Sequence, residues 1–184
     1  MQLINDIIQP ETELESLIIQ DSDFIAGALW GKPRNGHPEG QVIYHIGDVL
    51  KNVDSFSTKN DRSVLRSVAI IHDTFKYRVD KTKSKSGENH HAMIARRFAE
   101  KYISDTKILD IIELHDEAYN AYCVGSIKGK WDRAEARTKA LIERLGDSLE
   151  LYLTFYRCDN TTGDKNNDDF VWFNNIVDGR NKTK

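Results

Sequence analysis

One stretch of the sequence reads Val68-Ala69-Ile70-Ile71-His72-Asp73-Thr74-Phe75-Lys76 and joins an apolar run to a His-Asp pair. Val64 and Leu65 extend the apolar positions upstream, so the pattern predicts a helix that begins after Asn60 or Asp61 and is apolar on nearly all sides of its second half. We expect such a helix at the centre of the fold. The imidazole and the carboxylate at its end would then be buried, where polar groups need partners.

The composition narrows the class of protein. The chain has 184 residues, of which 39% are hydrophobic and 30% charged, and this suits one compact domain over 1–184 with a sizeable core. A net charge of -3 argues against an extended nucleic-acid-binding face, which would be basic. No apolar run approaches a membrane-spanning length, the first residues lack a signal-peptide pattern, and Cys123 and Cys158 give no disulfide framework. We therefore expect a cytoplasmic protein that is not a membrane protein.

Apolar residues at helical spacing recur along most of the chain, and prolines are few. They predict an all-α fold with a motif-bearing core over about 37–160, on which N-terminal helices within 1–30 and a C-terminal helix over 170–178 are packed. The expected helices cover 11–20, 24–30, 41–56, 61–71, 90–102, 105–118, 131–145 and 149–157. Residues 149–157 also alternate as a strand would, but no partner strand is predicted and we favour a helix.

Histidines and aspartates fall at the ends or on the inner faces of these helices. Burying such groups without a partner costs several kcal/mol, and a divalent metal ion satisfies a whole set of them at once. Imidazole combined with carboxylate suits Zn, Mn, Fe, Co or Ni better than Ca. The groups are His45, His72-Asp73, His90-His91, His115-Asp116 and Asp159.

The chain resembles the HD-domain superfamily of metal-dependent phosphohydrolases in the order of these residues, which runs His45, His72-Asp73, His91, His115, Asp159. The likeness covers roughly 37–160 and includes Lys76, three positions after the pair. The lead-in over 36–45 is similar to the HD domain of bacterial CCA-adding tRNA nucleotidyltransferases. The later histidines look like those of dinuclear HD proteins, including HD-GYP phosphodiesterases, although the Gly-Tyr-Pro part of that pattern is missing.

The resemblance implies a metal-binding role for six residues. A first ion would be bound by His45, His72, Asp73 and Asp159, and a second by His91 and His115, with Asp73 bridging the two. His90 is the alternative to His91, because the local pattern fits either. The resemblance therefore implies one or two divalent ions of Mn, Fe, Co, Ni or Zn, with Mg as a further candidate.

The resemblance also implies catalytic and substrate-binding residues. Asp73 or a nearby carboxylate would orient the attacking water, and Lys76, about one helical turn away, would hold a phosphate oxygen as a point charge. Asp116 is also explained as a carboxylate behind the ligands, and His37 as a surface histidine. The expected substrate-binding residues are Lys76, Arg78, Asp80, His37, Glu39 and Asp116.

These residues favour a metal-dependent phosphohydrolase that cleaves a phosphomonoester or phosphodiester, with a nucleotide as the expected substrate. The expected partner is therefore a small anionic phosphorylated molecule, and a homo-oligomer is compatible with the sequence. Two alternatives stay open. A mixed-valent di-iron oxygenase of the HD type uses a similar ligand set, and a non-catalytic nucleotide-binding or sensor module would share the fold.

Overall fold

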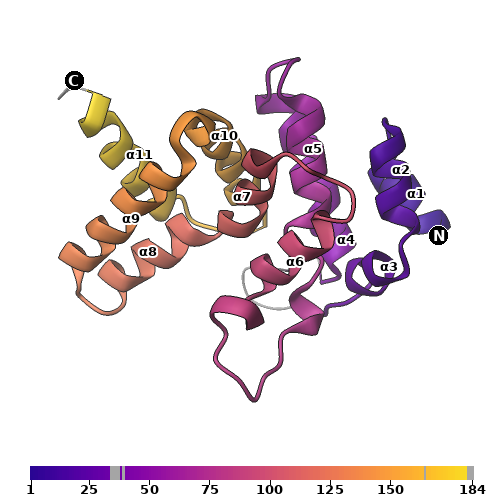
Figure 1. Cartoon of the computed structure of the whole chain (residues 1–184), viewed down its shortest axis with the longest axis horizontal. Helices are drawn as coiled ribbons and strands as arrows, with labels where there is room; N and C mark the ends of the chain where they lie inside the picture. The colour runs from indigo at the N-terminus through magenta and orange to yellow at the C-terminus, as the bar shows by residue number, and fades with distance from the viewer. Residues whose placement is uncertain (34–37, 39, 164, 182–184) are drawn as a thin grey trace.

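The computed structural model describes residues 1–33, 38, 40–163 and 165–181, and shows the predicted all-α fold (Figure 1). In this part of the chain the only pairing of the β type is an isolated bridge between Gly31 and Gln41. Three short 3-10 helices, η1 (Lys76–Arg78), η2 (Gly87–Asn89) and η3 (Gly146–Ser148), join the longer elements. The α-helices are α1 (Gln2–Ile8), α2 (Glu13–Gln20), α3 (Ser22–Ala28), α4 (Val42–Phe56), α5 (Arg62–Ile71), α6 (His91–Ala99), α7 (Thr106–Leu114), α8 (Glu117–Ser126), α9 (Trp131–Leu145), α10 (Leu149–Asn160) and α11 (Asp168–Asn181).

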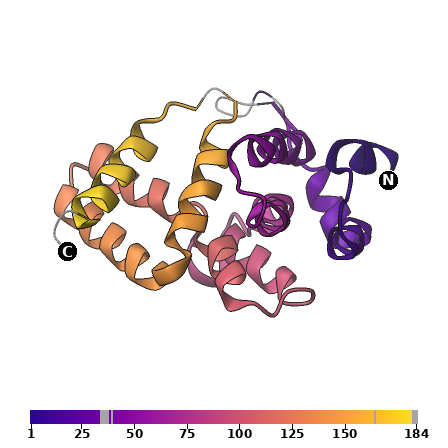
Figure 2. The ribbon, with the colours of Figure 1, turned by 90° about the horizontal axis from the view of Figure 1, so that it is seen from above.

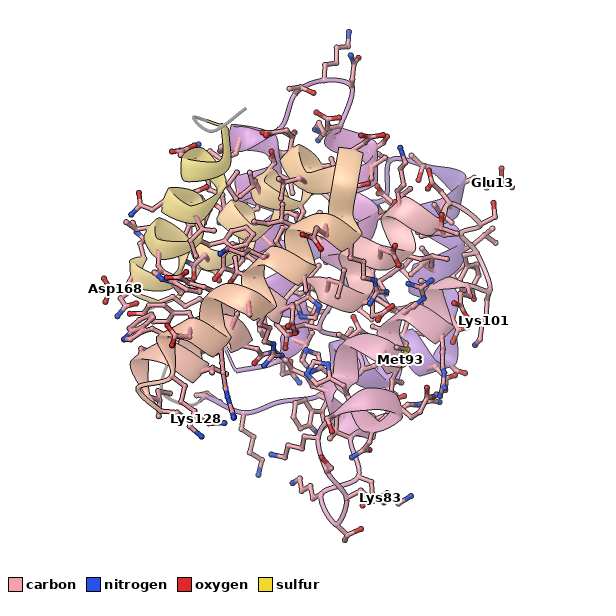
Figure 3. The ribbon with its side chains drawn as sticks, turned by 60° about the vertical axis from the view of Figure 1, so that its left-hand side comes forward. Glu13, Lys83, Met93, Lys101, Lys128 and Asp168 are labelled. Carbon is pink, nitrogen blue, oxygen red and sulfur yellow. The ribbon has the colours of Figure 1, made fainter. Side chains whose placement is uncertain are left out.

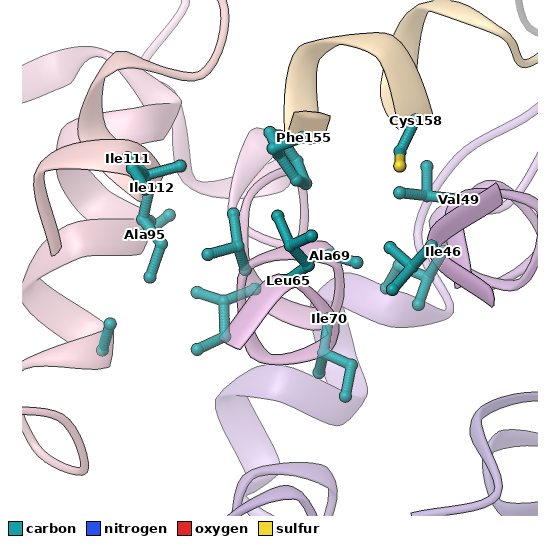
Figure 4. Packing of buried hydrophobic residues seen from close by; sticks show 14 of the residues in the cluster. Ile46, Val49, Leu65, Ala69, Ile70, Ala95, Ile111, Ile112, Phe155 and Cys158 are labelled. Atoms are coloured by element: carbon teal, nitrogen blue, oxygen red, sulfur yellow. The ribbon is translucent and has the colours of Figure 1, made fainter. Parts of the chain in front are cut away.

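Helix α5 lies in the middle of the molecule. It packs against α4, α7 and α10, while α1 to α3 lie at one end of the fold and α8, α9 and α11 at the other (Figures 1 and 2). Every residue of α5 from Leu65 to Ile71 is buried, as expected for a helix that is apolar on nearly all sides. In Figure 4, Ala69 and Leu65 of this helix lie between Ile46 of α4 and Ile112 of α7, with Phe155 of α10 above them.

Helix boundaries follow local side-chain chemistry. Thr12 accepts a hydrogen bond from the Glu15 N–H, and Asp21 and Asp105 cap α3 and α7 in the same way, because the first turn of a helix leaves backbone donors unpaired. Helices α4 and α9 match the predicted ranges closely. The alternative strand over 149–157 is wrong, since these residues form α10, which continues through Asn160.

Two helices were missed in the sequence. Helix α1 is a single short amphipathic segment that buries Ile4 and Ile8. The helix expected over 105–118 breaks at His115, and α8 then begins at Glu117. Helix α8 buries only small residues such as Gly125, where an added Cβ would lie 2.2 Å from the Trp131 ring, so its inner face gives no apolar periodicity. The C-terminal helix spans Asp168–Asn181 rather than 170–178.

The N-terminal helices are held to α5 by a buried ion pair. The Arg66 guanidinium donates to both carboxylate oxygens of Glu15, at 2.9 Å each, and Nη2 also donates to the Ile8 carbonyl at 3.0 Å. Both side chains are almost fully buried. Each charge therefore meets its complement inside the protein.

Within the described residues, no helix is long and apolar enough to cross a lipid bilayer.

Candidate metal centre

Six predicted ligands come together from five separate places in the fold. His45 lies on α4, His72 and Asp73 directly follow α5, and His91 is the first residue of α6. His115 directly follows α7, and Asp159 lies in the last turn of α10. The central position of α5 explains this convergence, because α4, α7 and α10 pack against it and α6 packs on α7.

The first group consists of His45, His72 and Asp159. The Nε2 atoms of the two imidazoles lie 3.2 Å apart. Asp159 Oδ1 is 3.1 Å from Nε2 of His45 and 3.9 Å from Nε2 of His72. All three groups thus direct a potential metal ligand toward one point.

The second group repeats this geometry with His91, His115 and Asp73. The Nε2 atoms of the imidazoles are again 3.2 Å apart, and Asp73 Oδ1 lies 3.4 Å from that of His91 and 3.3 Å from that of His115. The other oxygen of Asp73 faces the first group, 3.5 Å from Nε2 of His45 and 3.6 Å from Nε2 of His72. The carboxylate of Asp73 therefore lies between the two groups.

The donor chemistry of both groups fits a bound cation. Asp73 Oδ1 is buried and has no hydrogen-bond partner among the described residues. In each group two ring nitrogens face each other, so that two lone pairs oppose unless a proton or a cation lies between them. Imidazole nitrogens with carboxylate oxygens are the ligands that divalent transition metals prefer.

Backbone and hydroxyl groups fix the ring orientation of three histidines. Nδ1 of His72 is 2.9 Å from the Ala69 carbonyl, and Nδ1 of His115 is 2.9 Å from the Ile112 carbonyl. For His45, the Thr162 hydroxyl lies 3.5 Å from Nδ1. A proton held on Nδ1 leaves the Nε2 lone pair for a metal ion, and partners of this kind orient metal-bound histidines in general.

The electrostatics favour the metal-binding protonation states of His72, Asp73 and Asp159. Burial lowers the pKa of His72 to about 3, so this imidazole is neutral at physiological pH. Burial alone would raise the pKa of Asp73, but the charge of Lys76 and the neighbouring His72 imidazole hold it well below its usual value. The pKa of Asp159 is held well below its usual value in the same way, with Lys165 as the main charge.

Two lysines flank the centre. The ammonium group of Lys76 pairs with Asp73 Oδ2, in keeping with the expected position one turn beyond the pair. Lys165, on the segment between α10 and α11, donates to Asp159 Oδ1 at 2.9 Å and to its carbonyl at 3.0 Å. Both side chains are about one-fifth exposed, so both reach solvent as well as the centre.

His90 and Asp116 form a third group beside the second. Nε2 of His90 lies 3.4 Å from Asp116 Oδ2, and Nε2 of His91 lies 3.8 Å from the same oxygen. His91 is thus the histidine of the pair that faces Asp73 and His115, while His90 faces Asp116. Asp116 therefore lies at the edge of the centre, beside His90 and His91.

Two other predicted substrate-binding residues, Arg78 and Asp80, have partners away from the centre. Arg78 pairs with Asp23 of α3 and is not brought to the centre. Asp80 accepts hydrogen bonds from the backbone and hydroxyl of Thr82 in its own loop. His37 and Glu39 lie outside the described residues.

Three residues at the site were missed in the sequence. Lys165 and Thr162 follow the predicted ligand Asp159 on a segment with no apolar pattern, so nothing marked them. Tyr152 lies within the expected helix over 149–157, and its buried hydroxyl donates to the Leu114 carbonyl at 3.0 Å and accepts from the Ala118 N–H at 3.3 Å. Tyr152 thereby holds the turn that carries His115.

Helix α3 touches the centre through a glycine. A Cβ added at Gly27 would lie 1.9 Å from the carbonyl oxygen of Thr74, the residue that follows Asp73. The absence of a side chain at this position allows α3 to pack directly on the His-Asp turn.

Comparison with known families agrees with this geometry. The family model described as HD domain matches residues 40–151, more than half of the chain, and the chain belongs to this family. Proteins of the HD domain superfamily bind divalent metal ions and are generally metal-dependent phosphohydrolases. The superfamily and the all-α fold predicted from the sequence are confirmed. No curated protein and no solved structure gives a significant match.

Proposed function

We propose that the protein hydrolyses a phosphomonoester or phosphodiester of a small molecule, with a nucleotide as the leading candidate, and that it uses two divalent ions. The carboxylate of Asp73 carries this proposal. One of its oxygens faces one pair of imidazoles and the other faces the second pair, and the buried Oδ1 has no hydrogen-bond partner among the described residues. An arrangement of this kind suits a carboxylate that bridges two cations.

Each group of ligands has a defined part in this proposal. His45, His72 and Asp159 would hold one ion, His91 and His115 the other, and Asp73 would bind both. When bound, such ions lower the pKa of a coordinated water and neutralise charge on a phosphate. The ligand set favours Mn, Fe, Co, Ni or Zn over Mg, because imidazole nitrogen binds these ions more readily.

The remaining residues bind and orient the substrate in this proposal. Lys76 and Lys165 lie beside the two ligand carboxylates Asp73 and Asp159, so their ammonium groups would hold non-bridging phosphate oxygens. Asp73 would also accept a hydrogen bond from the attacking water and thereby orient it. Positioning and charge neutralisation of this kind account for most of the catalysis in phosphoryl transfer.

Hydrolysis after controlled metal loading tests the proposal. Chelator-treated protein would be reloaded with Mn, Co, Ni, Zn, Fe or Mg, with Ca as the control that imidazole sites disfavour. We expect hydrolysis of p-nitrophenyl phosphate or bis(p-nitrophenyl) phosphate, together with nucleotides, only after loading with a transition metal. Loaded protein that hydrolyses no phosphoester would overturn the proposal. Iron retention with oxygen consumption would then indicate an oxygenase, and nucleotide binding without turnover would indicate a sensor.

A further inference from the structure

A cavity of about 640 Å³ adjoins the metal centre. His90 and Asp116, which lie beside the second ligand group, line part of its wall. The rest of the wall comes from η2, α6, α8 and α9. A volume of this size is typical of sites for small organic molecules, so a substrate held at the centre has room for its remaining part here.

Two acidic residues of the cavity wall, Glu113 and Glu117, are neutralised by arginines. Arg137 donates to both oxygens of Glu117, with 2.6 Å between Nη2 and Oε2. Arg144 donates to both oxygens of Glu113, at 2.8 and 2.6 Å. These four charges therefore cancel in pairs, and they contribute little to the net charge that a ligand would meet.

Two lysines on the cavity wall carry uncompensated charge. Lys85 and Lys128 are exposed, and neither has an ion pair within the described residues. Figure 3 shows Lys128 at the same end of the molecule as the loop that carries Lys83. Two cations that line one cavity from different segments favour an anionic group between them.

Hydrogen bonds order the backbone of the two segments that carry these lysines. The loop that carries Lys85 is closed by Asn89, whose amide donates to the carbonyls of Asp80 and Ser84, each at 2.9 Å. Lys128 lies in the turn after α8 and precedes Gly129, which has a φ of 65° and whose N–H donates to the Gly125 carbonyl at 2.8 Å. Segments ordered in advance lose less entropy when a ligand binds.

Part of the cavity wall is uncharged. Met93, Leu114, Val124 and Leu141 give this part an apolar surface, and the amide of Asn120 adds a polar group. An apolar surface of this kind suits an uncharged organic body, such as a ring, better than a chain of phosphates.

We propose that the substrate carries a second anionic group, phosphate or carboxylate, which Lys85 and Lys128 bind while the scissile phosphoester lies at the metal centre. An uncharged body lies along the apolar wall between the two. This inference rests on the proposed phosphohydrolase function, and it narrows the substrate class to phosphoesters with two separated anionic groups.

Paired substrates test the inference. The double variant Lys85→Ala/Lys128→Ala would be compared with wild type on nucleoside 5′-monophosphates and the matching 3′,5′-bisphosphates. Losing charge-assisted hydrogen bonds should raise KM for the bisphosphates about tenfold or more, leave kcat unchanged and leave KM for the monophosphates within about twofold. Lys130→Ala, in the same turn as Lys128 but off the cavity wall, should leave both kinds of substrate unaffected. Equal effects on both kinds of substrate, or no effect, would overturn the inference.

A binding measurement separates this inference from the proposed function. Calorimetric titration of the metal-loaded protein with adenosine 3′,5′-bisphosphate needs no turnover. If no phosphoester is hydrolysed, a Kd about tenfold weaker in the double variant, with a difference that shrinks as salt is added, still supports the anion site. An undetectable interaction with wild type, or equal Kd values, overturns it.

Discussion

Helix α5 carries two clusters of buried polar groups, and the two clusters differ in how their hydrogen-bonding groups are paired. In the middle of the helix, Arg66 meets the carboxylate of Glu15, and donors face acceptors throughout. At its C-terminal end, Nε2 of His72 faces Nε2 of His45, and acceptors face acceptors. One cluster is complete within the chain, whereas the other gains its complement only from a cation.

The difference separates what stabilises the protein from what makes it reactive. A buried ion pair that is complete contributes to holding helices together, and removing one partner leaves an uncompensated charge. A buried set of ligands with an excess of lone pairs contributes little to stability in the absence of a metal ion. When an ion binds, the binding energy of the ion stabilises the folded state. The two clusters should therefore respond differently to mutation, metal and pH.

The largest effect is expected at the metal centre. Asp73→Asn keeps the shape of the side chain but removes the charge between the two ligand groups. We expect a loss of phosphoester hydrolysis on the order of a thousand-fold, together with reduced metal content, because bound ions supply several kcal/mol of transition-state stabilisation. Activity and metal content per chain would be measured together. Asp147→Asn, at a side chain that is 95% exposed, is the matched control. Full activity in Asp73→Asn would refute the role of Asp73 at the metal centre.

The complete cluster should respond in stability instead. Arg66→Met leaves the carboxylate of Glu15 buried without its partner, and we expect a loss of about 3–5 kcal/mol in the free energy of unfolding. Urea denaturation measures this loss, and the metal content of the folded fraction should not change. The double variant Arg66→Met/Glu15→Leu should recover most of the loss. A loss below about 1 kcal/mol in the single variant would contradict the comparison.

A smaller effect is expected from the hydroxyl behind His45. Thr162→Val removes the oxygen that lies near Nδ1 of His45 with little change of volume. Removing partners of metal ligands commonly weakens metal affinity about 10–100-fold, and we expect a change of this size at the first group. Competition with a chelator of known affinity gives the value. Thr161→Val, one residue away at an exposed hydroxyl, is the control, and equal affinities in the two variants would refute the role of Thr162.

The smallest effect is the response of the metal-free protein to pH. Because the pKa of His72 is about 3 when folded and 6.5 in the unfolded chain, its contribution to stability is complete above about pH 6.5. That contribution is lost as the pH falls from about 6.5 toward 3, with a slope of at most about 1.4 kcal/mol per pH unit. Nitrogen NMR of the histidine rings should show no titration of His72 between pH 8 and 5, and a midpoint near 6.5 would contradict the prediction.

His115 should behave in the opposite sense in the same spectra. Burial tends to lower its pKa, but the neighbouring carboxylates of Asp73 and Asp116 raise it above the usual value. Its contribution to stability is therefore present below pH 6.5 and lost as the pH rises through the raised pKa. Two buried histidines of one centre should thus titrate on opposite sides of the ordinary value.

The sequence predicted the ligand cluster better than its surroundings. A histidine or aspartate at the end of a strongly apolar helix is buried together with that helix. The convergence of His45, His72 and Asp159 therefore follows from helix burial together with the family resemblance. The choice between His90 and His91 could not be made in advance. Adjacent residues point about 100° apart on a helix, and the pattern did not show that α6 begins at His91.

Residues outside regular apolar patterns were the ones that the sequence did not place. Arg78 lies close to Lys76 in sequence, but its guanidinium meets Asp23 of α3, a contact that depends on how two distant segments pack. Lys165 approaches Asp159 because the segment after α10 turns back, which no local preference of the sequence predicts. Tertiary contacts of this kind decide which charges reach the centre.

The contact between Gly27 and Thr74 limits how this protein could be altered by laboratory evolution. Position 27 lies far along the chain from the His-Asp pair, so a library that randomises only the neighbourhood of the ligands in sequence would treat it as free. Any side chain there would push on the carbonyl that follows Asp73. Searches for new substrates should therefore keep this glycine fixed and vary the cavity wall on α8 and α9 instead.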